Sequence, residues 1–214
     1  MKIIVKNFIE KPINAQALSN RKLVYGAGTN DAPYATQPML SGTRVKCPYY
    51  AVWDNMLKRV YYAKFIIRQP CYVGTSIHKP WLSFMAFRAW METQQWQNKV
   101  LDKDLIDPGN KHYSPLNCCF IEQSLNNLMT INKRTKGKYP AGVTWNNNNK
   151  QFVARLSIDT KRVYLGDFVT EQLASNAYLE AKANHIIDIA YQQQDVRLKA
   201  GLLLHATKLM GEIV

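Results

Sequence analysis

Residues 141–178 read AGVTWNNNNKQFVARLSIDTKRVYLGDFVTEQLASNAY, and this stretch decides the fold of the C-terminal part of the chain. Apolar and polar side chains alternate over 151–159, which predicts a strand with one buried face. We expect shorter strands over 142–145 and 162–165, with the Asn-rich residues 146–150 forming a hairpin loop. The sequence therefore predicts a sheet of three short strands.

A helix is expected directly after this sheet. Thr170 is a good N-cap, and Glu171 favours the positive end of a helix. We expect residues 166–168 to end the third strand and the helix to run from Thr170 toward Gln194. The alternation places Phe152, Ala154, Leu156 and Ile158 on one face of the sheet, and Val153, Arg155 and Ser157 on the other. One face is then buried under the helix, and the other is free to lie in a groove of DNA.

The runs GVTW, FVARLSID and KRVYLGDFVTEQLASNAY within this stretch resemble the APETALA2/ethylene-response-factor DNA-binding domain, most specifically over 162–170. The resemblance implies a three-stranded sheet that reads the major groove and packs on one long helix. It implies DNA contacts from Thr144, Lys150, Arg155, Ser157, Arg162 and Tyr164. The hairpin loop is Asn-rich here, and Arg155 stands where the plant domains usually carry an acidic residue, so their sequence preference does not transfer. The alternative is the solvated face of an ordinary small sheet.

The charge of the chain favours a nucleic-acid partner. Lys and Arg number 28 against 15 Asp and Glu, which gives a net charge of +13. The excess is greatest over 133–162, where the basic residues are Lys133, Arg134, Lys136, Lys138, Lys150, Arg155, Lys161 and Arg162, and the acidic residue is Asp159. A membrane surface is the rival partner, but no stretch forms a basic amphipathic helix. We therefore expect double-stranded DNA, and no membrane, as the partner.

Hydropathy and cysteine usage indicate a soluble protein. No apolar run approaches the roughly 18 residues of a spanning helix, and the N-terminus lacks the apolar core of a signal peptide. Cys47, Cys71, Cys118 and Cys119 form no CxxC pair, so we expect reduced thiols, with a zinc site at Cys47, Cys71 and His78 as the alternative. The expected location is the cytoplasm of a bacterial host cell. We expect a monomer, with a homodimer as the alternative.

Residues 99–129 read KVLDKDLIDPGNKHYSPLNCCFIEQSLNNLM. The pattern predicts a strand over 100–106, a turn, a second strand over 117–121 and a helix over 122–129. Asp102 and Asn117 are the candidate metal ligands, because hard divalent cations such as Mg²⁺ prefer oxygen ligands. They bind one ion if the hairpin brings them side by side. Asn126 on the helix is a further candidate, to orient the site or hold a phosphate.

This segment resembles the HNH family of ββα-metal nucleases, in which an Asp-His pair, an Asn at the second strand and an Asn or His on the helix assemble the metal site. Together with CPYYAVWDNMLKR at 47–59, the chain is similar to HNH-like endonucleases of phages and other mobile elements that carry an APETALA2-type domain after the nuclease. The resemblance covers about 46–195. It implies a sequence-specific DNA endonuclease, of homing or interference type, that uses Mg²⁺ or Mn²⁺.

One departure from the HNH pattern concerns the general base. Lys103 stands where the family places its base histidine, and a lysine amine is a poor base at neutral pH. His112, just before the second strand, is the alternative, because imidazole ordinarily titrates near neutral pH. A third option is a slow enzyme without a protein base, in which Lys103 stabilises the charge on the phosphorus centre. Asp102 and Asp104 share a strand face and could both bind one ion.

Two functions remain open on the sequence alone. The first is metal-dependent phosphodiester hydrolysis, with nicking of one strand as the product of a single site. The second is a non-catalytic site-specific DNA-binding protein, a repressor or replication blocker, on a degenerate nuclease scaffold. Nucleophilic Ser chemistry and phosphate-binding Gly loops find no support, because GxGxxG, GxxxxGK[ST] and GxSxG are all absent.

The expected fold class is α+β, an HNH-like ββα-metal domain followed by a three-stranded antiparallel sheet packed on a helix. Aromatic residues at helical spacing around 49–61 and 81–91 are expected to be core. The Gly- and Pro-containing stretch 26–38 is expected to be a flexible entry segment. The expected segments are an N-terminal segment (1–45), the nuclease domain (46–131), a basic linker (132–138), the DNA-binding domain (139–195) and a C-terminal helix (196–214).

Overall fold

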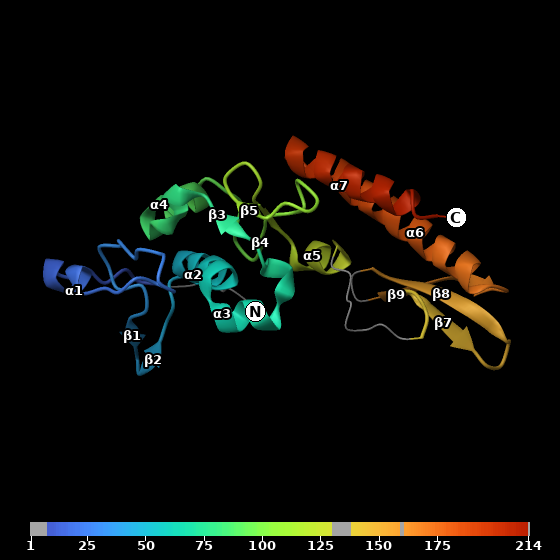
Figure 1. The fold of residues 1–214 in the computed structure, drawn as a ribbon, viewed down its shortest axis with the longest axis horizontal. Coiled ribbons are helices and arrows are strands. Elements are labelled where there is room, and N and C mark those ends of the chain that lie inside the picture. The colour runs from blue at the N-terminus through green and yellow to red at the C-terminus, as the bar shows by residue number, and fades with distance from the viewer. Residues whose placement is uncertain (1–7, 130–137, 159–160, 214) are drawn as a thin grey trace. The chain divides into compact units, whose positions relative to one another are not determined.

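The structure is a computed structural model that describes residues 8–129, 138–158 and 161–213, and Figure 1 shows the order of its helices and strands. The described residues form two compact units. The first comprises the described parts of Met1–Asp104 and Gly109–Glu122, and the second those of Leu105–Pro108 and Gln123–Val214. The expected basic linker lies almost entirely outside the described residues, and so does the turn at Asp159-Thr160.

The first unit is built around an aromatic core. Its main helices are α2 (Pro48–Tyr61) and α4 (Phe84–Glu92), with the shorter α1 (Ala15–Ser19), α3 (Ala63–Arg68), η1 (Pro70–Tyr72) and η2 (Lys79–Leu82). Trp53, Phe84 and Phe87 are fully buried, and Trp53 Nε1 donates a hydrogen bond of 2.7 Å to the carbonyl of Trp81. The expectation that the aromatic residues around 49–61 and 81–91 form core is confirmed for most of them, whereas Tyr61 is exposed.

The stretch 26–38 is packed against this core, which contradicts the expectation of a flexible entry segment. Ala32 and Tyr34 are buried in the same cluster as α2 and α4. The Arg21 guanidinium donates hydrogen bonds of 2.8, 2.7 and 2.6 Å to the carbonyls of Asn30, Ala32 and Tyr34. One half-buried guanidinium therefore bonds three backbone carbonyls that would otherwise bond water.

Short strand pairs complete the first unit. β1 (Met39–Leu40) pairs with β2 (Thr43–Arg44), β3 (Ser76–Ile77) is parallel to β5 (His112–Tyr113), and β4 (Val100–Asp102) is antiparallel to β6 (Cys119–Ile121). The expected strands at 100–106 and 117–121 are shorter than predicted. The first ends at Asp102, because its side-chain Oδ1 accepts from the amide of Asp104 at 3.0 Å and turns the chain. α5 (Gln123–Met129) follows β6 along the chain and belongs to the second unit.

The second unit contains a three-stranded antiparallel sheet, as expected for an α+β protein. The strands are β7 (Val143–Asn146), β8 (Gln151–Ile158) and β9 (Lys161–Phe168), in the order β7-β8-β9. The prediction that residues 166–168 end the third strand is wrong. Ala154 faces Gly166 and Arg155 faces Tyr164, so Leu165 forms a bulge and β9 continues to Phe168. Gly166 at φ 142° allows this irregularity without a steric cost.

One helix covers one side of this sheet, and a second helix packs on the first. α6 (Glu171–Tyr191) begins where expected, with Thr170 accepting from the amide of Leu173 at 3.2 Å, and ends three residues before Gln194. Its Ala174 packs on Val143 and Ala154 of the sheet. α7 (Val196–Met210) packs back along α6, which confirms the predicted C-terminal helix. The backbone at Leu105 approaches α7 where Gly201 leaves room for it. Among the described residues, no helix is long and apolar enough to cross a membrane.

Candidate DNA interface and candidate metal site

The expected DNA-contacting side chains gather on the sheet face that points away from α6. Cross-strand partners share a face, and the register pairs Thr144 with Val153, Arg155 with Tyr164, and Ser157 with Arg162. We call the open face the exposed side chains Thr144, Arg155, Ser157, Arg162 and Tyr164. Lys150 lies outside this face, exposed in the turn between β7 and β8 at φ 50°.

Contacts among these side chains give the open face a defined shape. Arg155 Nη1 donates to Thr144 Oγ1 at 3.4 Å, and its guanidinium carbon lies 6.0 Å from the centre of the Tyr164 ring. The pKa of Tyr164 is raised by desolvation and then by its hydrogen bond to Asp167, so the hydroxyl stays a neutral group at pH 7. A guanidinium beside a tyrosine on a pleated surface offers both hydrogen-bond donors and a flat apolar face to a base edge.

Val153 shares this side of the sheet, as the alternation predicted, but it is only 2% exposed. It occupies the middle strand between Thr144 and Asp167. This face of the sheet is therefore not uniformly polar, because the buried Val153 lies at its centre. The exposed long side chains on it are Arg155, Arg162 and Tyr164.

The charge around the sheet is strongly positive. Among the described residues of 138–168, the basic residues are Lys138, Lys150, Arg155, Lys161 and Arg162, and the acidic residue is Asp167. The expected basic residues Lys133, Arg134 and Lys136, and the acidic Asp159, lie outside the described residues. A surface with this balance attracts the phosphate backbone of nucleic acid.

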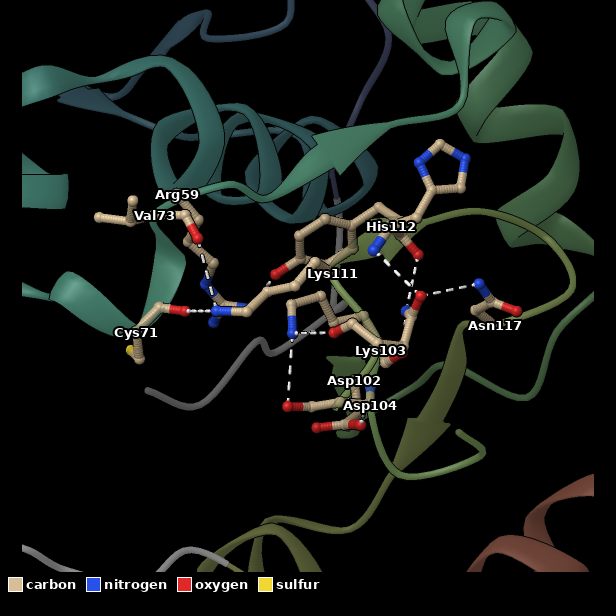
Figure 2. A network of polar contacts seen from close by, with 11 residues as sticks. Arg59, Cys71, Val73, Asp102, Lys103, Asp104, Lys111, His112 and Asn117 are labelled. Carbon is tan, nitrogen blue, oxygen red and sulfur yellow. Dashed lines mark hydrogen bonds and ion pairs between the residues drawn. The ribbon is translucent and has the colours of Figure 1, made fainter. Parts of the chain in front are cut away.

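The second candidate site lies in the first unit, and we call it the loop cluster: Asp102, Lys103, Asp104, Asn110, His112 and Asn117. Hydrogen bonds of Asn110 connect Lys103, His112 and Asn117. Figure 2 shows Asn117 apart from Asp102 and Asp104. Asp102 ends β4, whereas Asn117 lies in the turn before β6.

Figure 2 draws Asp102 and Asn117 in different parts of the network, and a metal site shared by these two residues stays a prediction. Asp102 faces Cys119 across the strand pair. Asn117 has other partners: its side-chain Nδ2 donates to Asn110 Oδ1 at 3.0 Å, and its backbone N–H donates to Ser114 Oγ at 3.3 Å. A turn at Ser114 therefore displaces Asn117 from the strand that the sequence predicts for it.

Asp102 and Asp104 also differ from the prediction of a shared strand face. The strand ends at Asp102, and the amide of Asp104 donates back to the Asp102 carboxylate at 3.0 Å. The Asp102 carboxylate therefore lies next to the backbone of Asp104, and the two residues flank Lys103 in the sequence. Carboxylate pairs are oxygen donors of the kind that Mg²⁺ and Mn²⁺ take, so their chemistry fits one such ion.

Lys103 is held as a structural cation. Its side chain is buried, and the residue is 7% exposed. Nζ donates to the carbonyl of Asn110 at 2.9 Å and pairs with Asp104 Oδ2 at 3.3 Å, while the Tyr113 ring lies 6.0 Å away. An ammonium engaged by two acceptors serves charge compensation better than proton abstraction.

His112 lies in a strand and not in the hairpin loop where the sequence placed it. It belongs to β5, opposite Ser76 of the parallel strand β3. Its Nδ1 lies 2.8 Å from Ser76 Oγ, a hydrogen bond that fixes the plane of the ring. The ring is half-buried, and it is the backbone of His112, not the ring, that bonds Asn110; Figure 2 shows the ring pointing away from Asp102 and Asp104.

Asn110 is the residue of this site that the sequence did not single out. Its Nδ2 donates to the carbonyls of Lys103 and His112 at 2.6 and 2.8 Å. Its Oδ1 accepts from the amide of His112 at 3.1 Å and from Asn117 Nδ2 at 3.0 Å. Both ends of one amide are thus used, and Asn110 fixes three of the expected site residues relative to one another. The only signal in the sequence is the turn-forming run DPGN.

Arg59 is a second residue that the sequence did not indicate. It reaches from α2 to donate from Nη1 to Tyr113 Oη at 3.4 Å, and its guanidinium carbon lies 5.6 Å from the centre of the Tyr72 ring. Burial lowers the pKa of Arg59, but Tyr113, Tyr72 and the carboxylate of Asp102 raise it, and the net direction is upward. A permanent positive charge therefore faces Asp102 from the core side.

The remaining candidates lie on other elements. Asn126 lies on α5, in the second unit. Cys47 is buried and Cys71 exposed, and within the described ranges no group of three or more His, Cys, Asp or Glu side chains could hold a metal ion, so the zinc alternative is not supported. Burial raises the pKa of Cys118 to about 12, which keeps it an inert thiol.

Comparison with known proteins gives no independent assignment: no family model, no curated protein and no solved structure matches this chain.

Proposed function

We propose that this chain is a metal-dependent DNA endonuclease that holds double-stranded DNA on the open face of β7–β9 and hydrolyses a phosphodiester bond at the loop cluster. The observation that carries the DNA part is the open face itself, where one arginine–tyrosine pair and Arg162 are exposed on the side away from α6. The nuclease part is supported by the antiparallel pair β4–β6, which α5 follows along the chain as in a ββα unit.

Asp102 and Asp104 are the groups that would hold a divalent cation, Mg²⁺ or Mn²⁺. Such an ion supplies Lewis-acid polarisation of the scissile phosphate and stabilisation of the leaving oxygen. Arg59 places a positive charge near Asp102, and the interaction between the two raises the pKa of Arg59. Asn110 holds the chain on both sides of the site, since it bonds the backbone of Lys103 and of His112.

Proton transfer from the attacking water falls to His112 in this proposal, with Lys103 compensating charge. His112 supplies an imidazole that can accept a proton, and Ser76 orients its ring through a hydrogen bond to Nδ1. Asn117 acts as a positioning residue, because its side-chain amide donates a hydrogen bond to Asn110. One such site cuts one strand, so the expected product is a nick, and double-strand cleavage requires two events or two copies.

A second candidate function is a non-catalytic, site-specific DNA-binding protein, such as a repressor or replication blocker. The specific observation in its favour is Lys103, which occupies the position of the HNH base and is buried and engaged by Asn110 and Asp104.

A plasmid-nicking assay tests the proposal and separates these two functions. Supercoiled DNA is incubated with Mg²⁺ or Mn²⁺ and with wild type, Asp102→Ala, Asn117→Ala, Lys103→Ala or His112→Ala. The proposal expects open circles with wild type, none with Asp102→Ala, and a strong reduction with His112→Ala. Absence of cutting by wild type, together with salt-sensitive DNA binding, supports the second candidate.

A further inference from the structure

A second basic surface lies in the first unit, outside the loop cluster. Residues 58–79 contain Lys58, Arg59, Lys64, Arg68 and Lys79 and no Asp or Glu. They span the end of α2, all of α3 and η1. The whole chain contains 15 acidic residues, and none falls in this run. The electrostatic potential around the run is therefore positive.

Contacts between side chains connect this segment into one surface. Lys58 Nζ lies 5.5 Å from the centre of the Phe65 ring, and Phe65 lies 5.7 Å from Tyr72, ring centre to ring centre. Tyr72 in turn faces Arg59 at 5.6 Å. Cations and rings therefore alternate from α2 through α3 to η1, and the two rings connect Lys58 with Arg59.

Lys111 extends the surface from a distant part of the sequence. Its Nζ donates to the carbonyls of Cys71 and Val73, a contact drawn in Figure 2. We call the α3 surface the set Lys58, Lys64, Arg68 and Lys111. Lys64, Arg68 and Lys111 are exposed, and among the described residues no carboxylate lies within ion-pair distance of any of the four.

We propose that the α3 surface binds the phosphate backbone of duplex DNA, independently of the base sequence read by the open face. This inference rests on the proposed function. Duplex DNA carries about one charge per 1.7 Å of axis, and uncompensated lysines and arginines on three neighbouring elements suit such a line of charge. Tyr61 and Tyr62 are exposed beside them, and Ile67 is 77% exposed.

A lipid surface is less well matched by this geometry. Membrane-surface helices need a continuous apolar face over several turns, whereas α3 has 6 residues. Its basic groups also come from α2, α3 and the Lys111 segment, so they do not form one polar helix face opposite an apolar one.

The test is the salt dependence of DNA binding by the full chain. Fluorescence anisotropy with a duplex of arbitrary sequence is measured for wild type and for Lys64→Gln/Arg68→Gln. The matched control is Lys11→Gln/Lys22→Gln, which removes two exposed lysines from the same unit. Each lost phosphate contact lowers the slope of log K against log salt by roughly 0.9, so we expect a decrease of about 1.8 for the α3 variant and none for the control. Circular dichroism melts verify that both variants are folded.

A third variant, Arg155→Ala/Arg162→Ala, separates this inference from the proposed function. If the open-face variant loses target binding while Lys64→Gln/Arg68→Gln keeps the wild-type slope, the α3 proposal is overturned and the proposed function stands. If wild type binds no duplex at all, both fail. Binding of wild type to vesicles of phosphatidylserine and phosphatidylcholine, lost in Lys64→Gln/Arg68→Gln without any change in DNA affinity, also overturns the proposal.

Discussion

The open face of the second unit and the loop cluster of the first unit hold their functional side chains in different ways. On the open face, strand register sets the positions: Arg155 faces Tyr164 and Ser157 faces Arg162 because the backbone ladder places them there. In the loop cluster, the strands are 2 or 3 residues long, and side-chain hydrogen bonds through Asn110 set the positions. The first surface should therefore tolerate side-chain truncation, while the second should depend on single polar atoms.

Removing divalent cations should have the largest effect of the changes considered. It should abolish nicking at the loop cluster and leave DNA binding by the open face unchanged. Chelation with EDTA is expected to reduce nicking to background, because the Asp102 and Asp104 carboxylates then have no ion to place at the phosphate. DNA binding by the open face should persist. The measurement is nicking and gel-shift on the same samples, with Mg²⁺ added back as control; cutting that survives chelation contradicts the metal role.

Asn110→Ala is expected to destabilise the first unit by about 2–3 kcal/mol, since it leaves two carbonyls, one amide and Asn117 without their partner. Urea unfolding monitored by tryptophan fluorescence measures this. Asn110→Asp is the matched variant, because it keeps the Oδ1 acceptor and loses the Nδ2 donor. An unchanged unfolding midpoint for Asn110→Ala shows that the loop cluster does not depend on this residue.

Gly142→Ala and Gly109→Ala form a pair that compares the two regions through the backbone. Both glycines have positive φ, 77° and 94°. A Cβ at Gly142 overlaps the ring of Tyr178, whereas one at Gly109 meets nothing within 4 Å. We expect about 1 kcal/mol of destabilisation at Gly109 from conformation alone, and about 2 kcal/mol or more at Gly142. Thermal melts check the order, and equal effects refute the overlap.

Arg155→Ala should have the smallest effect on the stability of the protein and should lower only its affinity for DNA. We expect a loss of about 1–3 kcal/mol in affinity for a target duplex, with an unchanged melting temperature, because the side chain is exposed. Lys208→Ala removes an exposed charge from α7 of the same unit and is the control. Equal loss of affinity in both variants indicates a nonspecific charge effect and not a contact of the open face.

The same contrast explains which features the sequence could predict. α7 begins at the predicted residue 196, and the N-cap of α6 is the predicted Thr170, because helix periodicity and capping are local. The faces of β8 follow from alternation, but the burial of Val153 and the bulge at Leu165 depend on neighbouring strands. Asn110 could not be singled out, since its four side-chain hydrogen bonds depend on how a turn, a strand and a loop meet in space.

The most direct test of the central claim measures nicking rate and DNA affinity on one target duplex for Asp102→Asn and for Arg155→Ala/Arg162→Ala. The account predicts that Asp102→Asn keeps wild-type affinity and loses roughly 100-fold or more in rate, the size of effect expected when an electrostatic stabiliser of the transition state is lost. It predicts that the arginine variant loses affinity but recovers the wild-type rate at saturating protein. If Asp102→Asn cuts at the wild-type rate, the loop cluster is not the site of cleavage.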